Sequence, residues 1–312
     1  MKGEPKKRGG GQGPRVCVLV LNWNGREDTI ECLHSLESVE YLDLEILLVD
    51  NGSVDGSVKM VREKFPDLSI LETGKNLGYA AGNNRGITYA FSRGARYVIL
   101  LNNDTVVDPN FVKELVLVAE STPGAGLLSS KVFFYDRPEA LWFAGGTFSL
   151  FTGRSTHFGY NEPDDGRFDE VIEIERACGC AMMVSAEYCE AVGLLNEEYF
   201  CYCEETDWSL RGKKAGYRAL FVPKSVVFHK VSRATGGTLS GSYLYYVVRN
   251  TLKCLKDNSP GWFNAVRGFV VIAVYFLSLF TMSIPKLRGA QNIFFGARDF
   301  YLNRFGERGG EV

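Results

Sequence analysis

The first 120 residues alternate short apolar runs with helical segments, and this alternation restricts the possible folds more than any other feature. The apolar runs cover Val16–Leu21, Leu44–Val49, Ser69–Leu71 and Arg96–Leu101. Helical spacing is found between them, over 26–38, 54–65 and 77–93. Continuous apolar strands that alternate with helices form βαβ units, whose parallel sheet is buried on both faces. The sequence therefore predicts an α/β fold with a mostly parallel central sheet.

Polar residues follow three of these strands at equivalent topological positions. They are Asn22, Asp50 and Asp104. Open α/β sheets bind ligands at the carboxyl ends of their strands. A single polar strand end is more often a turn or a helix cap. Recurrence after three strands favours a binding site over that simpler explanation.

Two acidic clusters, a hundred residues apart, contain the candidate chemistry. One is the segment 102–104, and the other is 204–207, followed downstream by His229 at the end of an apolar run. Oxygen ligands at a strand end suit a hard divalent cation such as Mg²⁺ or Mn²⁺, which in turn suits phosphates. A second carboxylate group is then available as a base. Metal, diphosphate and base together predict group transfer from a nucleotide-activated donor.

Composition restricts the class of protein and its partners. With 312 residues, 46% of them hydrophobic, the chain is long enough for one large α/β domain and an appendage. A net charge of −2 provides no general attraction to nucleic acid. Residues 1–15 are basic and glycine-rich without an apolar stretch, which predicts a disordered arm rather than a signal peptide.

The cysteine content favours a cytosolic location. Eight cysteines without a secretory signal predict reduced thiols in a cytoplasmic compartment. The pairs at 178/180 and 201/203 leave a structural zinc site as a minor alternative, because the usual C-x₂-C knuckle is missing. The C-x-C spacing instead places both thiols of a pair on one face of a strand.

The middle of the chain changes character. Residues 131–184 are rich in aromatics and glycine, which predicts mixed or antiparallel strands forming the far wall of a cleft. Trp142 with the adjacent glycines 145–146 is a candidate for the acceptor site, although a core role is equally compatible. A helix over 207–215 and strands over 217–222 and 225–229, separated by a proline, complete this section.

The C-terminal section is predicted to be helical and membrane-associated. After a helix over 243–255, the segment 268–284 carries no charge and is flanked by aromatic and basic residues. Three interpretations remain open: a helix in the plane of a membrane, a transmembrane span, and a buried or oligomer-facing helix. The amphipathic stretch 293–305 is also suited to a bilayer surface.

Several segments in this order resemble the family 2 glycosyltransferases, with the greatest similarity to the rhamnosyltransferase-type branch. They are 18–25, 49–57, 76–84, 101–104, 179–184, 204–211 and 226–229. The resemblance covers about residues 15–230 and continues weakly through Arg249 and Asn250. It implies a GT-A (Rossmann-like) fold, with a nucleotide-sugar-binding half at 16–120 and an acceptor-binding, catalytic half at 121–240. Residues 241–312 would form the C-terminal helices at the membrane.

The resemblance also implies an activity. It is the metal-dependent, inverting transfer of a sugar from a nucleotide-diphosphate sugar, such as a UDP- or dTDP-sugar, to a hydroxyl of a glycan or lipid-linked acceptor. Such transfer serves polysaccharide, cell-wall or glycolipid synthesis. The implied partners are donor, acceptor, the cytosolic membrane surface and, through an oligomer-facing helix, a second copy of the chain; nucleic acid has no role.

The implied site residues come from the matching motifs. Asp50 would contact the nucleobase or ribose with Asn22 and Asp55 nearby, and Asn83 would lie by the nucleotide sugar. The other donor-binding candidates in these motifs are Asn51, Ser53, Gly78 and Asn103. Asp104 ends a D-x-D-like motif and would bind the metal. His229 matches a position that completes the metal shell in some relatives.

The chain departs from the family pattern at two places. Asn102 begins the D-x-D-like motif, so Asp104 is its only carboxylate, and donor phosphates and water would supply the remaining ligands. The catalytic Glu-Asp pair of the family is Glu204-Glu205 here. By position Glu205 is the expected base, and Asp207 is a rival whose place at a helix start also suits a cap.

Two alternatives from other classes are a nucleotidyltransferase and a non-catalytic, membrane-bound sugar-binding protein. The first would be expected to show a glycine-rich signature with a basic residue near the first strand, and residues 22–25 lack one. The second would tolerate the loss of acidic residues, whereas Asp104 and Glu205 are both present.

Overall fold

The computed structural model describes residues 13–231, 241–259, 261, 264–280 and 285–308. Its strands are β1 (Val16–Asn22), β2 (Leu44–Asp50), β3 (Ser69–Glu72), β4 (Tyr97–Asn102), β5 (Thr105–Val107), β6 (Ala125–Phe134), β7 (Arg137–Phe143), β8 (Gly146–Phe148), β9 (Ser155–His157), β10 (Ile172–Ile174), β11 (Ala181–Ser185) and β12 (Arg218–His229). Its helices are α1 (Arg26–Leu36), α2 (Ser57–Lys64), α3 (Gly78–Ser92), α4 (Phe111–Ser121), α5 (Ala186–Val192), the 3₁₀ turn η1 (Glu197–Tyr199), α6 (Glu204–Lys214), α7 (Gly241–Asn258), α8 (Asn264–Ser278) and α9 (Lys286–Tyr301).

One large sheet organises the α/β part of the molecule. Its strand order is β10-β12-β6-β11-β4-β1-β2-β3, with β5 and β7 added at β12 and β6. The strands β3, β2, β1 and β4 are mutually parallel, as predicted for the first half of the chain. Strand β11 is antiparallel to both β4 and β6, and it joins the parallel half to the mixed half. The prediction of a mostly parallel central sheet is confirmed.

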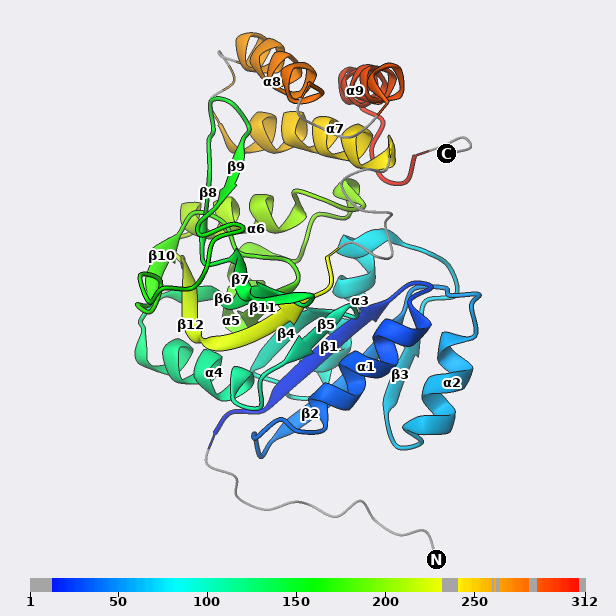
Figure 1. The fold of residues 1–312 in the computed structure, drawn as a ribbon, viewed down its shortest axis with the longest axis vertical. Coiled ribbons are helices and arrows are strands. Elements are labelled where there is room, and N and C mark those ends of the chain that lie inside the picture. Colours follow the sequence, from blue (N-terminus) through cyan, green and yellow to red (C-terminus); the bar gives the residue numbers. More distant parts are fainter. Residues whose placement is uncertain (1–12, 232–240, 260, 262–263, 281–284, 309–312) are drawn as a thin grey trace, which may run out of the picture.

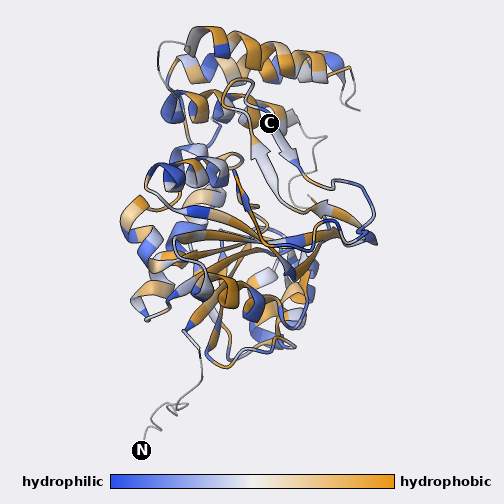
Figure 2. Ribbon diagram, turned by 90° about the vertical axis from the view of Figure 1, so that its left-hand side faces the viewer, coloured by the Kyte–Doolittle hydropathy of each residue, from blue (hydrophilic) through white to orange (hydrophobic). Residues whose placement is uncertain are grey.

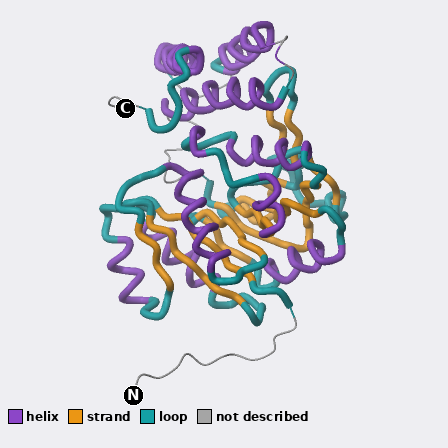
Figure 3. Tube along the Cα trace, turned by 180° about the vertical axis from the view of Figure 1, so that it is seen from behind, coloured by secondary structure: helices purple, strands orange, loops and turns teal. Residues whose placement is uncertain are grey.

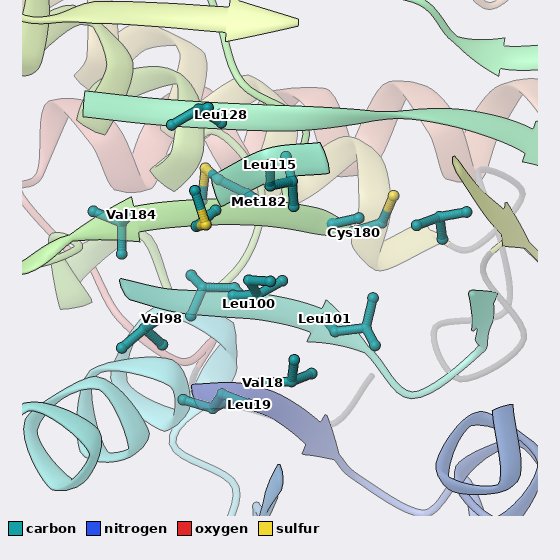
Figure 4. Close-up of a cluster of buried hydrophobic side chains, with 14 of the residues drawn as sticks. Val18, Leu19, Val98, Leu100, Leu101, Leu115, Leu128, Cys180, Met182 and Val184 are labelled. Atoms are coloured by element: carbon teal, nitrogen blue, oxygen red, sulfur yellow. The ribbon is translucent and has the colours of Figure 1, made fainter. Parts of the chain in front are cut away.

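The core lies on both faces of this sheet. Leu19, Leu100, Met182 and Leu128 come from the neighbouring strands β1, β4, β11 and β6, and their side chains are buried (Figure 4). Helix α1 lies in front of the sheet in Figure 1, and α3 lies in front of it in the reverse view of Figure 3. Because both faces are covered, the strands are continuous apolar runs rather than alternating ones.

The C-terminal helices form a second core. Leu244, Val248 and Leu252 lie on one face of α7 and pack with residues of α8 and α9, while Phe148 and Leu210 join this cluster from the α/β part. Figures 1 and 2 show α7 between the α/β body and the outer helices. Within the described ranges, no helix combines the length and the apolar content needed to cross a bilayer. Part of the segment 268–284 and most of the basic arm 1–15 lie outside those ranges.

Several predicted boundaries were wrong. Strand β12 continues through Pro223, and the disturbance appears as a register shift against β6 between Val222 and Val226. Helix α6 begins at Glu204 rather than at Asp207, so Asp207 lies inside its first turn. Residues 201 and 203 lie in the loop before α6, not on a strand. Helices α4 and α5 were not predicted, although the sequence carries start and stop signals for both: Asp108-Pro109-Asn110 and Pro123-Gly124 around α4, and Ser185 and Gly193 around α5.

Helices α7 and α9 cross closely at Gly296, which generates a stability prediction. A Cβ added there would lie 2.5 Å from the backbone oxygen of Tyr245. We expect Gly296→Ala to lower the free energy of unfolding by about 1–3 kcal/mol, since backbone atoms cannot move aside cheaply. Gly289→Ala on the same helix is the matched control, because its Cβ would meet the flexible end of Leu279. Equal melting temperatures for the two variants would contradict this account.

Candidate active site

The carboxyl ends of β1, β2 and β4 are held level by their pairing register. Asn22 pairs with Asp50 across β1 and β2, and Leu21 pairs with Asn102 across β1 and β4. The Nδ2 of Asn22 donates to Asp50 Oδ1 and to Ser53 Oγ, both at 3.0 Å. The structure therefore places three of the predicted donor-binding residues in one buried hydrogen-bonded group.

The other end of the Asn22 amide holds two further loops. Its Oδ1 accepts from the backbone N–H of Gly25, from Thr29 Oγ1 at 2.9 Å and from Asn103 Nδ2 at 3.2 Å. Asn103 also donates to Thr29 Oγ1 at 2.9 Å. The Asn22 amide and the Asn103 Nδ2 thus form hydrogen bonds within the protein, and these bonds position the loops after β1 and β4.

Asn51 likewise holds the end of β2 to the start of α3 through side-chain hydrogen bonds. Its Oδ1 accepts from the backbone N–H of Leu77 at 3.0 Å, and its Nδ2 donates to the backbone oxygen of Gly78 at 3.0 Å. Gly78 has φ +82°, and a Cβ there would meet the backbone oxygen of Phe200 at 2.5 Å. Glycine is therefore required at this position. Asn83 lies one turn further along α3, and its buried Oδ1 has no hydrogen-bond partner within the described part of the chain.

Asp55 lies just before helix α2 and accepts hydrogen bonds from the first residues of both α1 and α2. Its Oδ2 accepts from the backbone N–H of Arg26 at 3.0 Å, and its Oδ1 accepts from the backbone N–H of Ser57 at 3.0 Å. Burial raises the pKa of Asp55, but the hydrogen bonds from Ser57 and Arg26 outweigh burial and lower it below its ordinary value. Asp55 therefore orders the loop between β2 and α2 as an anion and ties it to the start of α1.

Asp104 and His229 meet although 125 residues separate them. Strand β12 pairs with β5, so that His229 lies opposite Thr105. This register brings the Oδ1 of Asp104 to 3.1 Å from the Nε2 of His229. Burial alone would raise the pKa of Asp104, but the charge and hydrogen bond of His229 outweigh burial, so the pKa of Asp104 is lowered. Burial alone would lower the pKa of His229, but the charge and hydrogen bond of Asp104 outweigh burial, so the pKa of His229 is raised. Both shifts favour an ion pair. His229 Nδ1 is buried without a partner among the described residues.

Trp142 borders this pair. Its ring meets the ring of His229 edge-on, with centroids 4.9 Å apart, and meets His157 at 4.8 Å. Burial lowers the pKa of His157 to about 3, so His157 is neutral. Trp142 is thereby anchored against a candidate metal ligand, next to the wall formed by β7 and β8.

Glu205 is paired with an arginine that sequence analysis missed. Arg176 Nη2 donates to Glu205 Oε1 at 2.8 Å, and both side chains are buried. The signal in the sequence was a lone cation within the otherwise apolar or acidic stretch 171–184, because a buried arginine requires a partner.

The two neighbouring carboxyl groups differ from Glu205. Burial, reinforced by the charge of Glu205, raises the pKa of Glu204 well above its ordinary value, and Glu204 Oε2 is buried without a partner among the described residues. Asp207 is 1% exposed. Its Oδ2 accepts from Arg211 Nε and its Oδ1 from Asn258 Nδ2, both at 2.8 Å. Both oxygens of Asp207 are thus engaged within the protein.

The segment 176–180 connects the two acidic clusters. Arg176 at its start binds Glu205, and the backbone oxygen of Cys180 at its end accepts from the N–H of Asn102 at 2.9 Å. Between them, the backbone oxygen of Gly179 accepts from Tyr79 Oη at 2.5 Å. This segment brings the strand-end cluster 102–104 and the cluster 204–207 to one edge of the sheet.

The thiols do not build a zinc site. Cys178 and Cys180 approach to 3.3 Å between their sulfurs, and both are buried. Across the described ranges, no cluster of three or more His, Cys, Asp or Glu side chains is placed to hold a metal ion. Asp104 and His229 therefore offer two protein ligands at most.

An open groove lies along the outer face of α3. Its volume is about 570 Å³, and it is lined by residues of β3, the following loop and α3: Leu71, Glu72, Thr73, Lys75, Leu77, Arg85, Thr88, Tyr89 and Ser92. None of the predicted site residues lines this groove.

Comparison with known proteins places the geometry in a family. Residues 17–190 match the model of Glycosyl transferase family 2. The N-acetylglucosaminyl-diphospho-decaprenol L-rhamnosyltransferase of Mycobacterium tuberculosis is 27% identical over 80% of this chain and 86% of its own length. The low-salt glycan biosynthesis hexosyltransferase Agl10 of Haloferax volcanii is 25% identical over 64% of this chain and 62% of its own length.

Solved structures share the fold. A mannosyltransferase from Pyrobaculum calidifontis, in complex with GDP-Man and Mn²⁺, superposes with a TM-score of 0.59 at 16% identity, covering 94% of this chain and 88% of its own. GalNAc-T7 with UDP, GalNAc and Mn²⁺ gives 0.63 at 16% identity, covering 93% of this chain and 56% of its own. These likenesses confirm the predicted GT-A fold.

The comparisons also decide between the classes of function considered above. Both the family model and the two relatives are glycosyltransferases, which disfavours a nucleotidyltransferase and a non-catalytic sugar-binding protein. The resemblance of the sequence to the rhamnosyltransferase-type branch is confirmed by the mycobacterial relative. The chain belongs to glycosyl transferase family 2 and is a glycosyltransferase.

Proposed function

We propose that this glycosyltransferase moves a sugar, with inversion, from a nucleotide-diphosphate sugar to a hydroxyl of a lipid-linked glycan acceptor, and that it requires Mg²⁺ or Mn²⁺. The observation that carries the proposal is the segment 176–180, which joins the 102–104 and 204–207 clusters at the carboxyl edge of the sheet. Ligand-binding loops of α/β sheets lie at this edge. A diphosphate-binding group and a base would thus face the same space.

Asp104 and His229 fit a divalent cation. They supply one carboxylate and one imidazole, which Mg²⁺ and Mn²⁺ accept when phosphates and water complete the shell. The carboxylate and the imidazole approach to 3.1 Å around a shared proton, and a divalent cation that displaced this proton would be held by both side chains. When bound, the cation would offset the negative charge that builds up on the departing nucleoside diphosphate.

The donor would lie over the three strand ends. Asp50 would bind the nucleobase or ribose, held by Asn22 and Ser53, and the orphaned Oδ1 of Asn83 would accept from the nucleotide sugar. Asn51, Asp55 and Gly78 would shape these loops rather than contact the donor, because their polar groups are engaged locally, and Asn103 would do so through its Nδ2. A UDP- or dTDP-sugar is the proposed donor.

Glu205 is the proposed base. It would accept the proton of the acceptor hydroxyl as the new glycosidic bond forms, while Arg176 holds its Oε1 in place. Burial and the charge of Glu205 raise the pKa of Glu204, which makes Glu204 the less suitable of the two as a carboxylate base. Asp207 is engaged by Arg211 and Asn258. Attack from the face opposite the leaving phosphate is a single displacement, so the configuration inverts.

The C-terminal helices would bring the enzyme to its acceptor. Leu287, Phe294 and Tyr301 recur every seven residues on α9 and are all more than half exposed, as are Phe269 and Phe280 around α8. Basic side chains flank them, including those of Arg288 and Arg298. We propose that residues 241–312 associate with the cytosolic face of a membrane. The mycobacterial relative is named for a diphospho-decaprenol-linked acceptor.

Metal dependence gives the first prediction of this proposal. UDP, dTDP, GDP and CDP sugars, each with Mn²⁺, Mg²⁺ or EDTA, are screened for a rise in melting temperature, which reports binding to the folded state. We expect one nucleotide to raise it in a metal-dependent way. In Asp104→Asn the metal-dependent part of the rise should vanish. An equal rise in Asp104→Asn and wild type would remove Asp104 from the metal site.

The identity of the base gives the second prediction. We expect Glu205→Gln to slow nucleoside-diphosphate release from the selected donor by about 10²–10⁴-fold, the usual contribution of a general base, with donor binding retained. The acceptor is polyprenyl-diphosphate-linked N-acetylglucosamine in vesicles. Glu204→Gln replaces a neutral acid by a neutral amide, so its loss should stay below about tenfold. A dead Glu204→Gln and an active Glu205→Gln would reverse the assignment.

Membrane association gives the third prediction. The double variant Phe269→Ser, Phe294→Ser should bind anionic vesicles at least about tenfold more weakly, since burying one such side chain contributes about 1.5–3 kcal/mol. Co-flotation with vesicles measures this binding. Leu42→Ser is the control, because Leu42 is 78% exposed in the loop before β2, far from α8 and α9. Equal flotation of all three proteins would contradict the proposed surface.

A further inference from the structure

The loop that precedes the proposed base has a strained backbone. Between η1 and α6, the non-glycine residues Phe200, Tyr202 and Cys203 have φ values of 64°, 67° and 71°. Such residues are unfavourable in the left-handed region and persist only where surrounding contacts impose that conformation. Glu204 and Glu205 follow directly, so the conformation of this loop sets where α6 begins.

Asn250 of α7 imposes that conformation. Its Nδ2 lies within hydrogen-bond distance of three carbonyls at the end of η1 and in the following loop, those of Tyr199 at 2.8 Å, Cys201 at 2.7 Å and Tyr202 at 2.9 Å. The side chain is fully buried. These contacts hold the three carbonyls in the irregular turn that is found.

Arg249 supports the same loop and orients Asn250. Its Nε donates to Asn250 Oδ1 at 3.0 Å, its Nη2 donates to the backbone oxygen of Tyr199 at 3.1 Å, and its Nη1 donates to that of Gly306 at 2.8 Å. The guanidinium is fully buried and lies over the ring of Tyr246 at 5.0 Å. With Arg249 on its oxygen, the Asn250 amide must present its N–H groups to the loop.

The donor-binding loop before α3 is held by hydrogen bonds that do not depend on Asn250. The backbone oxygen of Phe200 accepts from the N–H of Tyr79 at 2.6 Å, so the loop touches the start of α3. Yet Asn51 independently holds Leu77 and Gly78. Loss of the Asn250 contacts should therefore displace the base more than the donor loops.

We propose that Asn250, oriented by Arg249, is a positioning residue for the transfer reaction, which holds the 199–203 loop so that Glu205 meets the acceptor hydroxyl. This inference rests on the proposed function, with Glu205 as the base. It gives α7 two roles, because the same helix carries the outer helices α8 and α9 on its other side (Figure 1).

The test compares two asparagines of α7. We expect Asn250→Ala to lower kcat for nucleoside-diphosphate release by about 10²-fold, the scale of a misplacement near 1 Å, while the Kd of the donor changes less than threefold. Asn258→Ala is the matched control: Asn258 is also buried and also donates to α6, at Asp207, but does not touch the loop. It should lower the melting temperature with kcat within threefold of wild type.

A second variant separates the amide from its volume and serves if Asn250→Ala does not fold. Asn250→Asp keeps the shape and the oxygen that accepts from Arg249 but replaces the N–H donors, so the same fall in kcat is expected. A wild-type kcat in either folded variant, or an equal fall in Asn258→Ala, would overturn the proposal. Glu205→Gln is run in parallel. If it stays active, the base assignment fails; if it is inactive while Asn250→Ala is active, only the positioning role fails.

Discussion

The side-chain amide of Asn22 is the interaction on which the arrangement of the site depends. It is fully buried at the end of β1, and its two ends together reach Asp50, Ser53, Thr29 and Asn103. A buried amide that lost one of these partners would leave a polar atom unpaired, at about 1–3 kcal/mol. The loops after three parallel strands are therefore fixed relative to one another before any ligand binds, which is the condition for electrostatic stabilisation of a leaving diphosphate.

Charge is buried around this network in matched pairs. Arg176 neutralises Glu205, and His229 neutralises Asp104, while Glu204 is favoured in its neutral form. An unpaired charge at these depths would be strongly destabilising, whereas a pair with good geometry is tolerated. Under the proposed function, each carboxyl group has a separate role: Asp104 binds the cation, Glu205 accepts the proton, and Glu204 does neither.

The first of the C-terminal helices, α7, supports helix α6 and the loop that precedes it. Asn250 and Arg249 of α7 contact the loop before α6, and Asn258 contacts Asp207 within α6. The outer surface of the same unit carries exposed aromatic side chains on α8 and α9. Helix α7 thus lies between the proposed membrane surface and the proposed base. An acceptor that arrives from a bilayer would therefore have to pass only this one helix to reach Glu205.

The sequence by itself determined the parallel half of the sheet and its polar strand ends, because period, apolar runs and strand–helix alternation are local properties. The ordered motifs also identified the family. Only the tertiary structure decided which polar groups meet. Arg176 with Glu205 and Asn250 with the 199–203 loop are pairs separated by 29 and about 50 residues, whereas the family resemblance had already placed Asp104 and His229, 125 residues apart, in one metal shell. No local pattern encodes such contacts, since they follow from the order of strands and the packing of α7 on α6.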